Sequence, residues 1–487
     1  MIAFCRFLFA ACLLAGVPVC AGAQKAAFAM PAWAGKVGAG KLHFLKKQFL
    51  VNQYGAKGNG TTGATKAIQA AIDACAKAGG GTVSFEPGTY LMGAIFLKKG
   101  VHLNIPKGVL ILGSQNFADY PTINTRIAGM EMPWPAALIN VIGQKGVAIS
   151  GEGKVNARGK FCWDKYWAMR KDYEARGLRW IVDYDAQRVR TLLVQESSNI
   201  EIKGITFSNA GFWTVQVLYS HHVTVDGVTI RNNEDGHGPS TDGIDIDSSS
   251  WVLVENCDID CNDDDFCLKA GRDWDGLRVN RPTEYVVIRN SIARRGAGLL
   301  TMGSETSGSI RHVLAYNLVA KGTSNGLQIK SATTRGGVVE DIHFRNIEMD
   351  SVRTAFQFTM NWNPAYSYAT VPAGMDTSKV PQHWKTMLQK VTPESKGIPQ
   401  FRNIYVSGVQ ATNSTRAINA QGLEASVLEG FYFEKTRVGT KEAGELTHAA
   451  NWIFNNMTIE AADGKPLRVK ASRNITGLTN TETSVSH

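Results

Sequence analysis

Along most of the chain, apolar or small residues recur at relative positions 0, 2, 5 and 7 of a repeating unit. The unit that starts at Ile200 continues with Ile202, Ile205 and Phe207. An offset of 2 is the period of a strand, and the jump from 2 to 5 predicts a kink between two short strands. The units begin at Ile200, Val223, Val252, Val286, Val313, Ile342, Ile404, Phe431 and Trp452. Residues that accept unusual backbone angles occupy many kinks, namely Gly204, Gly227, Asn256, Asn290, Asn317 and Asn346.

The spacing of these units predicts the fold. From Ile200 to Ile342 they start 23, 29, 34, 27 and 29 residues apart, which is the length of one coil of a parallel β-helix. One coil cannot bury its apolar side alone, but stacked coils can. A β-sandwich or propeller would instead show hairpin turns about every 8–12 residues. We therefore expect an all-β protein, with residues 24–487 forming a single right-handed parallel β-helix domain.

Two segments interrupt the repeat. Residues 65–77 have the pattern of an amphipathic helix, which we expect to cap the open first rung, so that residues of about 45–100 form the N-terminal cap and first coils. Residues of about 360–400 contain five prolines and lack the repeat. We interpret them as an inserted loop, and such loops on a solenoid often lie over the binding face.

The composition is that of a folded protein, with 44% hydrophobic and 19% charged residues. A formal net charge of +10 favours an acidic partner. Because the sequence has no lysine- or arginine-rich run, zinc-finger spacing or helix-turn-helix pattern, we do not expect a nucleic-acid partner. Nothing in the sequence predicts the oligomeric state.

The N-terminus predicts export. A single charge at Arg6 precedes an apolar run over residues 7–19, which is too short to span a membrane, and small residues follow at 21–23. We expect a signal peptide over residues 1–23, cleaved near Ala23, and a periplasmic or secreted protein with no membrane span. Five cysteines then remain, at Cys75, Cys162, Cys257, Cys261 and Cys267; without a CxxC pair they predict buried thiols rather than zinc ligands.

Acidic side chains follow the same strand pair of adjacent predicted coils. Asp242 follows one coil, and Asp263 and Asp264 follow the next. Because adjacent rungs lie about 4.8 Å apart, these carboxylates can lie close together. The two coils after that contribute Ala297 between glycines and the cation Lys330.

Crowded carboxylates of this kind suit cleavage of a glycosidic bond. One carboxylic acid protonates the leaving oxygen, and a second carboxylate activates water or attacks directly. Crowding raises one pKa and so keeps a proton available near neutral pH. The alternatives are solvated acids or a calcium site; the alignment over four coils favours catalysis, with no metal and no cofactor.

Seven segments carry a resemblance to a known family: residues 54–60, 67–72, 211–213, 240–242, 262–264, 269–271 and 328–330. Together they resemble glycoside hydrolase family 28, the polygalacturonase family, whose fold is a pectin-lyase-like β-helix. The resemblance implies an inverting hydrolase of galacturonate-containing pectic polysaccharide. It also implies Asp263 as general acid, and Asp242 and Asp264 as the residues that hold the attacking water. The implied substrate-binding residues are Lys269, Arg272, Ala297, Gln328 and Lys330.

Two positions depart from the family pattern. Ala297 replaces the histidine of a Gly-His-Gly motif, which predicts a lower rate. Gln328 replaces the arginine of an Arg-Ile-Lys motif, leaving Lys330 as a point charge without a bidentate clamp. Both positions face the leaving-side sugar, so a rhamnogalacturonan-type substrate would also fit. His237, a surface-loop histidine by its context, could fill the place of the lost histidine.

Other interpretations remain open. A calcium-dependent pectic lyase would share the fold without needing paired acids, and a β-helical protein that only binds glycan could have lost the histidine and arginine. A register shifted by one would make Asp264 and Asp265 the acidic pair. Trp362 and Tyr366 of the inserted loop could stack on a sugar ring. That loop could also close one end of the groove, which would favour action on chain ends.

Overall fold

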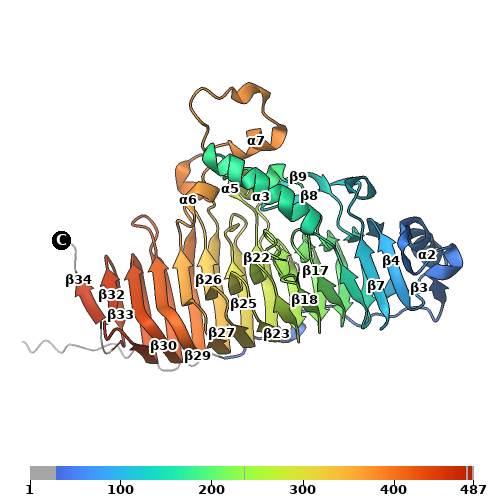
Figure 1. The fold of residues 1–487 in the computed structure, drawn as a ribbon. Helices are drawn as coiled ribbons and strands as arrows, with labels where there is room; N and C mark the ends of the chain where they lie inside the picture. Colours follow the sequence, from blue (N-terminus) through green and yellow to red (C-terminus); the bar gives the residue numbers. More distant parts are fainter. Residues whose placement is uncertain (1–28, 235, 479–480, 485–487) are drawn as a thin grey trace, which may run out of the picture.

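The computed structural model describes residues 29–234, 236–478 and 481–484, and it shows a long parallel β-helix (Figure 1). Successive coils pair in register, with Ile200 beside Val223, Val223 beside Val252, and Val252 beside Val286. The unit at Ile342 pairs directly with that at Ile404, so the intervening residues are an insertion. The predicted fold class is confirmed.

The strands run in chain order along the solenoid. In the N-terminal part they are β1 (Gln48–Leu50), β2 (Asn59–Gly63), β3 (Gly81–Ser84), β4 (Gly88–Met92), β5 (Ile95–Phe96), β6 (Val101–Asn104), β7 (Val109–Gly113), β10 (Ile139–Ile142), β11 (Lys145–Ser150), β12 (Lys154–Asn156), β13 (Leu192–Gln195), β14 (Ser198–Lys203) and β15 (Thr206–Ser208). The central coils hold β16 (Val215–Leu218), β17 (His221–Asp226), β18 (Thr229–Arg231), β19 (Ile244–Asp247), β20 (Ser250–Glu255), β21 (Asp258–Asp260), β22 (Asp264–Lys269), β23 (Thr283–Ala293), β24 (Gly298–Met302), β25 (Ile310–Lys321) and β26 (Asn325–Lys330). The last coils hold β27 (Val338–Asp350), β28 (Thr354–Thr359), β29 (Gln400–Gln421), β30 (Leu428–Thr447), β31 (Ala449–Ala461), β32 (Leu467–Lys470), β33 (Arg473–Thr476) and β34 (Thr481–Ser484).

The predicted kinks are left-handed backbone positions. Asn290, Asn317 and Asn346 have φ values of 51°, 54° and 48°. Their side chains form a ladder along the solenoid, in which Asn317 donates to Asn290 at 3.0 Å and Asn346 donates to Asn317 at 2.7 Å. Asparagine tolerates this conformation better than other side-chain-bearing residues, so the repeat position selects it.

The interior is a continuous apolar stack. Inward residues of successive coils, such as Val225, Val254 and Ile288, are 0% exposed. Helix α2 (Thr65–Lys77) covers the first rungs with Ile68, Ala71, Ile72 and Cys75, as its pattern predicted. All five expected thiols are free and buried.

Insertions gather on one side of the solenoid, above β22 and β26 in Figure 1. One is a hairpin of β8 (Thr122–Ile127) and β9 (Met130–Pro135), and another holds α3 (Lys160–Ala175) and α4 (Val182–Asp185). The segment 360–400 holds α6 (Pro364–Ser367) and α7 (Gln382–Met387), with 3-10 turns at Thr377–Lys379 and Glu394–Gly397. The remaining short elements are α5 (Asp273–Val279) and 3-10 turns at Ala34–Lys36, Val51–Tyr54 and Phe117–Asp119. Only the insertion at 360–400 was expected from the sequence.

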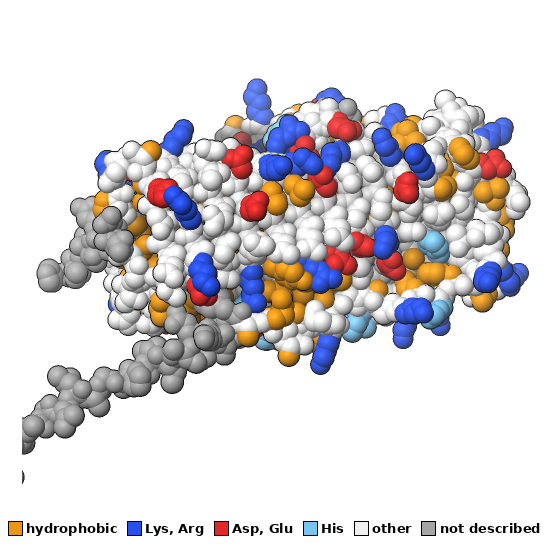
Figure 2. Space-filling model, turned by 90° about the horizontal axis from the view of Figure 1, so that it is seen from below, with side chains coloured by type: hydrophobic (Ala, Val, Ile, Leu, Met, Phe, Trp, Pro, Cys, Tyr) orange, Lys and Arg blue, Asp and Glu red, His pale blue; other side chains and the backbone are white. Residues whose placement is uncertain are grey.

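The predicted signal peptide over residues 1–23 lies outside the described residues. Among the helices of the described ranges, none combines the length and apolar character needed to cross a membrane. Seen from the side opposite the insertions, acidic and basic side chains are interspersed (Figure 2). On that face, the excess positive charge therefore forms no continuous basic patch.

Candidate active site

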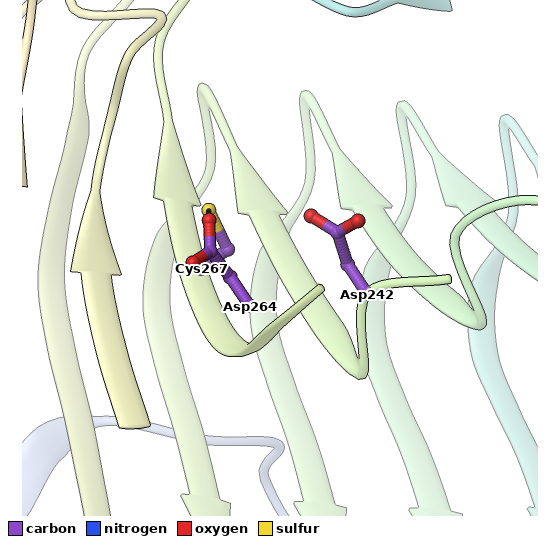
Figure 3. A group of neighbouring side chains, drawn as sticks. All are labelled: Asp242, Asp264 and Cys267. Atoms are coloured by element: carbon purple, nitrogen blue, oxygen red, sulfur yellow. Dashed lines mark hydrogen bonds between the residues drawn. The ribbon is translucent and has the colours of Figure 1, made fainter. Parts of the chain in front are cut away.

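Three carboxylates meet on the side that carries the insertions. Asp242 lies just before β19, and Asp263 and Asp264 lie at the start of β22 in the next coil. Backbone hydrogen bonds fix the two turns, because Thr214 N donates to Asp242 O and Gly243 N donates to Asp264 O, both at 3.0 Å. Asp242 and Asp264 project from neighbouring turns in Figure 3. All three acids line one cavity, and convergent polar groups in a cavity are typical of ligand sites.

Two lysines neutralise these acids. Lys330 Nζ lies 2.8 Å from Asp264 Oδ2. Lys269 Nζ lies 3.3 Å from Asp242 Oδ2 and 3.4 Å from Asp245 Oδ1. The lysine side chains are only 8% and 5% exposed, so each ammonium group is committed to its carboxylates.

Asp263 and Asp264 have opposite protonation preferences. Burial, reinforced by the charges of Asp242 and Asp264, raises the pKa of Asp263 to about 8. Burial also acts on Asp264, but Lys330 and Lys269 outweigh it and hold the pKa of Asp264 below its ordinary value. Near neutral pH the site therefore presents one carboxylic acid and one carboxylate, the combination that acid–base catalysis requires.

Asp245 is a site residue that the sequence analysis missed. Burial raises the pKa of Asp245 to about 7, opposed by Lys269 and by a hydrogen bond with Asp242. Burial, then the charge of Asp245, raises the pKa of Asp242 well above its ordinary value. Both carboxyls therefore favour the protonated form more than an ordinary aspartate does. Alternation along β19, with Ile244 and Ile246 in the core, was a signal that could have placed Asp245 on the same face as Lys269.

A metal does not suit this cluster. One oxygen each of Asp242 and Asp264 and the sulfur of Cys267 lie within 4.8 Å of one another. Burial, however, raises the pKa of the Cys267 thiol well above its usual range, and a thiol must be deprotonated to bind a metal. Lys269 and Lys330 already supply the positive charge that a metal ion would bring.

Three of the expected binding residues do not line the cavity. Gln328 is 4% exposed, and its Oε1 accepts from Thr301 Oγ1 at 3.2 Å. Ala297 supports the acidic turn through its backbone, since its N–H donates to Asp263 O at 2.8 Å. Arg272 is buried and donates to the carbonyls of Tyr366 and Ser367, so it anchors the insertion rather than facing the cavity.

Two sequence alternatives lose their geometric basis. Asp265 is 0% exposed and accepts from Cys261 Sγ at 3.4 Å, away from the cavity, which disfavours the shifted register. His237 stacks on Trp167 at 5.4 Å and does not line the cavity. Neither residue therefore joins the acidic group.

Aromatic rings form the walls. Trp213 lies beneath the Lys269 ammonium, at 4.9 Å from the ring centroid, and Trp362 lies beside Lys330 at 4.6 Å. Phe212 and Tyr366 also line the space, with Glu305, a buried acid 3.9 Å from Lys269 that the sequence analysis missed. Aromatic walls with a few polar groups are typical of sugar-binding clefts, where rings pack against the apolar faces of pyranoses.

Two insertions contribute to the walls of this cavity. Arg179 comes from the segment between α3 and α4, Asp183 from α4, and Tyr366 from α6. The insertions also contact each other, because Trp180 meets Trp384 edge-on at 5.3 Å and Trp180 Nε1 donates to Thr370 O at 2.8 Å.

The chain was compared with known families and proteins. The family model described as "Glycosyl hydrolases family 28" matches residues 97–426, and "Rhamnogalacturonase A/epimerase, pectate lyase-like" matches residues 49–132. A probable polygalacturonase of Vitis vinifera is 29% identical over 63% of this chain and 62% of its own length. An exo-poly-alpha-D-galacturonosidase of Dickeya chrysanthemi is 26% identical over 88% of this chain and 73% of its own. The chain thus spans about three fifths of the grapevine relative and three quarters of the bacterial one.

Solved structures show the same fold. An exopolygalacturonase from Thermotoga maritima superposes with a TM-score of 0.72 at 23% identity, covering 87% of this chain and 94% of its own. A family 28 exopolygalacturonase of Yersinia enterocolitica has a TM-score of 0.68 at 23% identity, and the superposition covers 91% of this chain and 78% of that one. At this identity the likeness concerns the β-helix alone.

Proposed function

Because the chain belongs to glycoside hydrolase family 28, we propose that it hydrolyses galacturonate-containing pectic polysaccharide from a chain end, as an exported enzyme. The observation that carries the proposal is the pairing of a protonated Asp263 with an ionised Asp264 in one cavity. The names of the relatives in Vitis and Dickeya support the substrate class. The sequence of residues 1–23 supports export.

Each acid has a role that follows from its protonation. Asp263 donates its proton to the glycosidic oxygen as the bond to the anomeric carbon breaks. Water attacks that carbon from the opposite face, and Asp264 takes up the proton of the water, so the anomeric configuration inverts. Lys330 keeps Asp264 ionised for this step.

Asp242 holds the water without acting as the base. Because burial and the charge of Asp245 raise the pKa of Asp242, its carboxyl keeps a proton that it donates to the water, while Asp264 remains the proton acceptor. Lys269 fixes the pair at 3.3 and 3.4 Å and so orients the water. Preorganised groups of this kind contribute to catalysis because they need not reorient during the reaction.

The contact between the two insertions favours exo action. Segments 160–185 and 360–400 meet through Trp180 and Trp384 beyond the acids. We infer that the joined insertions block the passage of a polymer at one end of the cavity, the closed end, so that a chain end enters the cavity. The relative from Dickeya is named an exo-poly-alpha-D-galacturonosidase, in agreement with this proposal.

The part of the site that would bind the leaving-side sugar also suits a second candidate substrate. Gln328 turns to Thr301 and offers no cation there. A rhamnogalacturonan-type substrate, whose leaving sugar is neutral, therefore fits as well as polygalacturonate.

The lyase interpretation is disfavoured because the ammonium groups of Lys269 and Lys330 lie where a calcium ion would have to bind between the carboxylates. A protein that only binds glycan has no need to bury three coupled acids.

A digest tests the proposal. Polygalacturonate and rhamnogalacturonan are incubated with the wild-type protein and with Asp263→Asn, and products are identified by mass and anomeric NMR. Saturated mono- or disaccharides of inverted configuration, absent with the variant, are expected. Unsaturated products would establish a lyase, and unchanged substrates with retained glycan binding would establish a binding protein.

A further inference from the structure

The cavity is lined by three cations, two of which are already engaged. They are Lys269, Lys330 and Arg179. The lysines hold the catalytic acids, and their side chains are 5% and 8% exposed. The Arg179 side chain is 14% exposed and comes from the inserted segment between α3 and α4 rather than from a coil.

Arg179 is held rigidly along one edge. Its Nη1 donates to Asp183 Oδ2 at 2.7 Å, and the other oxygen of Asp183 accepts from the buried Arg188 at 2.8 Å. The guanidinium also lies over the Tyr366 ring, 5.0 Å from its centroid. Although burial acts against it, the charges of Arg179 and Arg188 hold the pKa of Asp183 well below its ordinary value. The anchor therefore stays ionised at all working pH values.

The Nε atom of Arg179 is buried and has no hydrogen-bond acceptor among the described residues. The nearest acid, Glu174, has its Oε1 3.6 Å away, and that oxygen already accepts from Arg170 Nε at 2.7 Å. The guanidinium nonetheless lines the cavity, and an anchored arginine suits the planar, two-oxygen geometry of a carboxylate.

We propose that Arg179 is a specificity-determining residue whose guanidinium binds the carboxylate of the uronic acid unit at the closed end of the cavity. This inference rests on the proposed function, because it assumes that a pectic chain end enters there. The proposal assigns the recognition of negative charge to the insertion. Gln328, on the coil, is uncharged and cannot provide this recognition. Neutral sugars in the same position then gain nothing from Arg179.

The test compares acidic and neutral forms of one substrate. Trigalacturonate and its methyl ester are assayed with wild type, Arg179→Gln and Arg179→Lys. We expect Arg179→Gln to lower kcat/KM on trigalacturonate about 10- to 100-fold, mainly through KM, and to leave the ester nearly unchanged. Arg179→Lys should restore part of the loss. Arg176→Gln is the matched control, because Arg176 lies on the same segment, is half exposed, pairs with Asp172 at the surface and does not line the cavity.

Binding measurements separate the two proposals. Calorimetry with trigalacturonate on Asp263→Asn, with and without Arg179→Gln, measures recognition in the absence of turnover. A 10-fold or greater loss of affinity for the acid alone supports the role of Arg179 even if no pectic substrate is cleaved. Equal losses for acid and ester, or no loss for either, overturn it, whatever the wild-type activity.

Discussion

Lys330 Nζ reaches across one full rung of the solenoid to lie 2.8 Å from Asp264 Oδ2. Lys330 ends β26 and Asp264 begins β22, with β24 between them. The intermediate rung ends at Met302, and the next residue is Gly303, where an added Cβ would clash with the Lys330 backbone. Glycine at this rung therefore lets the backbone of Lys330 lie close enough for its side chain to reach Asp264.

Replacing Lys330 with methionine is expected to impair the base. Without the ammonium group the ionised form of Asp264 loses its main stabilisation, and the pKa of Asp264 rises. The acid limb of the kcat/KM profile should then move to higher pH, and kcat should fall about 100-fold or more. Lys321→Met, on the exposed end of β25, is the control. An unchanged acid limb would show that Asp264 is not the base.

The alkaline limb of the profile should report Asp263. Because the pKa of Asp263 is about 8, the general acid is protonated below that pH and is lost as pH rises through it. We expect kcat/KM to be level near pH 6–7 and to fall above about pH 8, since the pH dependence of kcat/KM reports groups of the free enzyme. Rates that stay constant up to pH 10 would be incompatible with this assignment.

The raised pKa of Asp263 should also lower the stability of the folded protein as the pH rises. The folded-state pKa of Asp263 is about 8, against 3.8 for an ordinary aspartate. The folded protein binds the proton more tightly, so this group stabilises folding at low pH and loses that contribution as pH rises from about 4 to 8. Asp263→Asn mimics the protonated acid and removes the penalty.

Thermal scans check this linkage. The substitution Asp263→Asn should raise Tm by roughly 2–5 °C at pH 8 and by much less at pH 5. Asp164→Asn, on an exposed helix surface, should give the same small difference at both pH values. A lower Tm for Asp263→Asn at pH 8 would contradict the raised pKa.

The repeat alone was enough to predict the coils. Residues such as Val223 and Val252 must face the interior, because a one-residue slip would turn every side chain outward. The insertions could not be predicted this way. The segment after α3 and the hairpin β8–β9 pack on each other and on the coil surface through aromatic residues such as Trp180 and Trp134, with no period of their own.

The site was predictable in part. Motif spacing led to Asp242, Asp263 and Asp264, because each follows a recognisable strand pair. The spacing did not show which of the other motif residues line the cavity, and Gln328 and Ala297 do not. Arg179 lies in an insertion whose position relative to the acids depends on tertiary contacts, and no local pattern records those contacts.

Gly298 lies so close to Asp264 that there is no space for a side chain at this position. A Cβ added at Gly298 would lie 2.5 Å from Thr301 Oγ1 and 3.0 Å from Asp264 Oδ1. Gly298→Ala should therefore displace the hydroxyl that donates to Asp264 and lower kcat about 10- to 100-fold, with little change in KM. Gly63→Ala, where no atom lies within 4 Å of the added Cβ, is the control. Wild-type kcat in Gly298→Ala would show that the position of Asp264 is not limiting.

The contact between Trp180 and Trp384 should decide whether the enzyme acts on chain ends. Trp384 is 6% exposed and its Nε1 donates to Asp185, so the ring ties the segment 360–400 to the α3–α4 insertion. Trp384→Ala removes both the ring contact and this hydrogen bond, at a local cost of about 3–5 kcal/mol. The closed end then opens, and internal linkages of a polymer gain access to Asp263.

This change is visible in the products. With Trp384→Ala, solution viscosity of polygalacturonate should drop faster per reducing end released, and oligomers longer than disaccharides should appear. Trp384→Phe keeps an apolar ring and should stay close to wild type, and Val371→Ala, an exposed position on the same insertion, should have no effect. If Trp384→Ala lost activity in proportion on short and long substrates without longer products, the insertions would serve only to hold the cavity wall. The exo mode would then have to arise from the coils themselves.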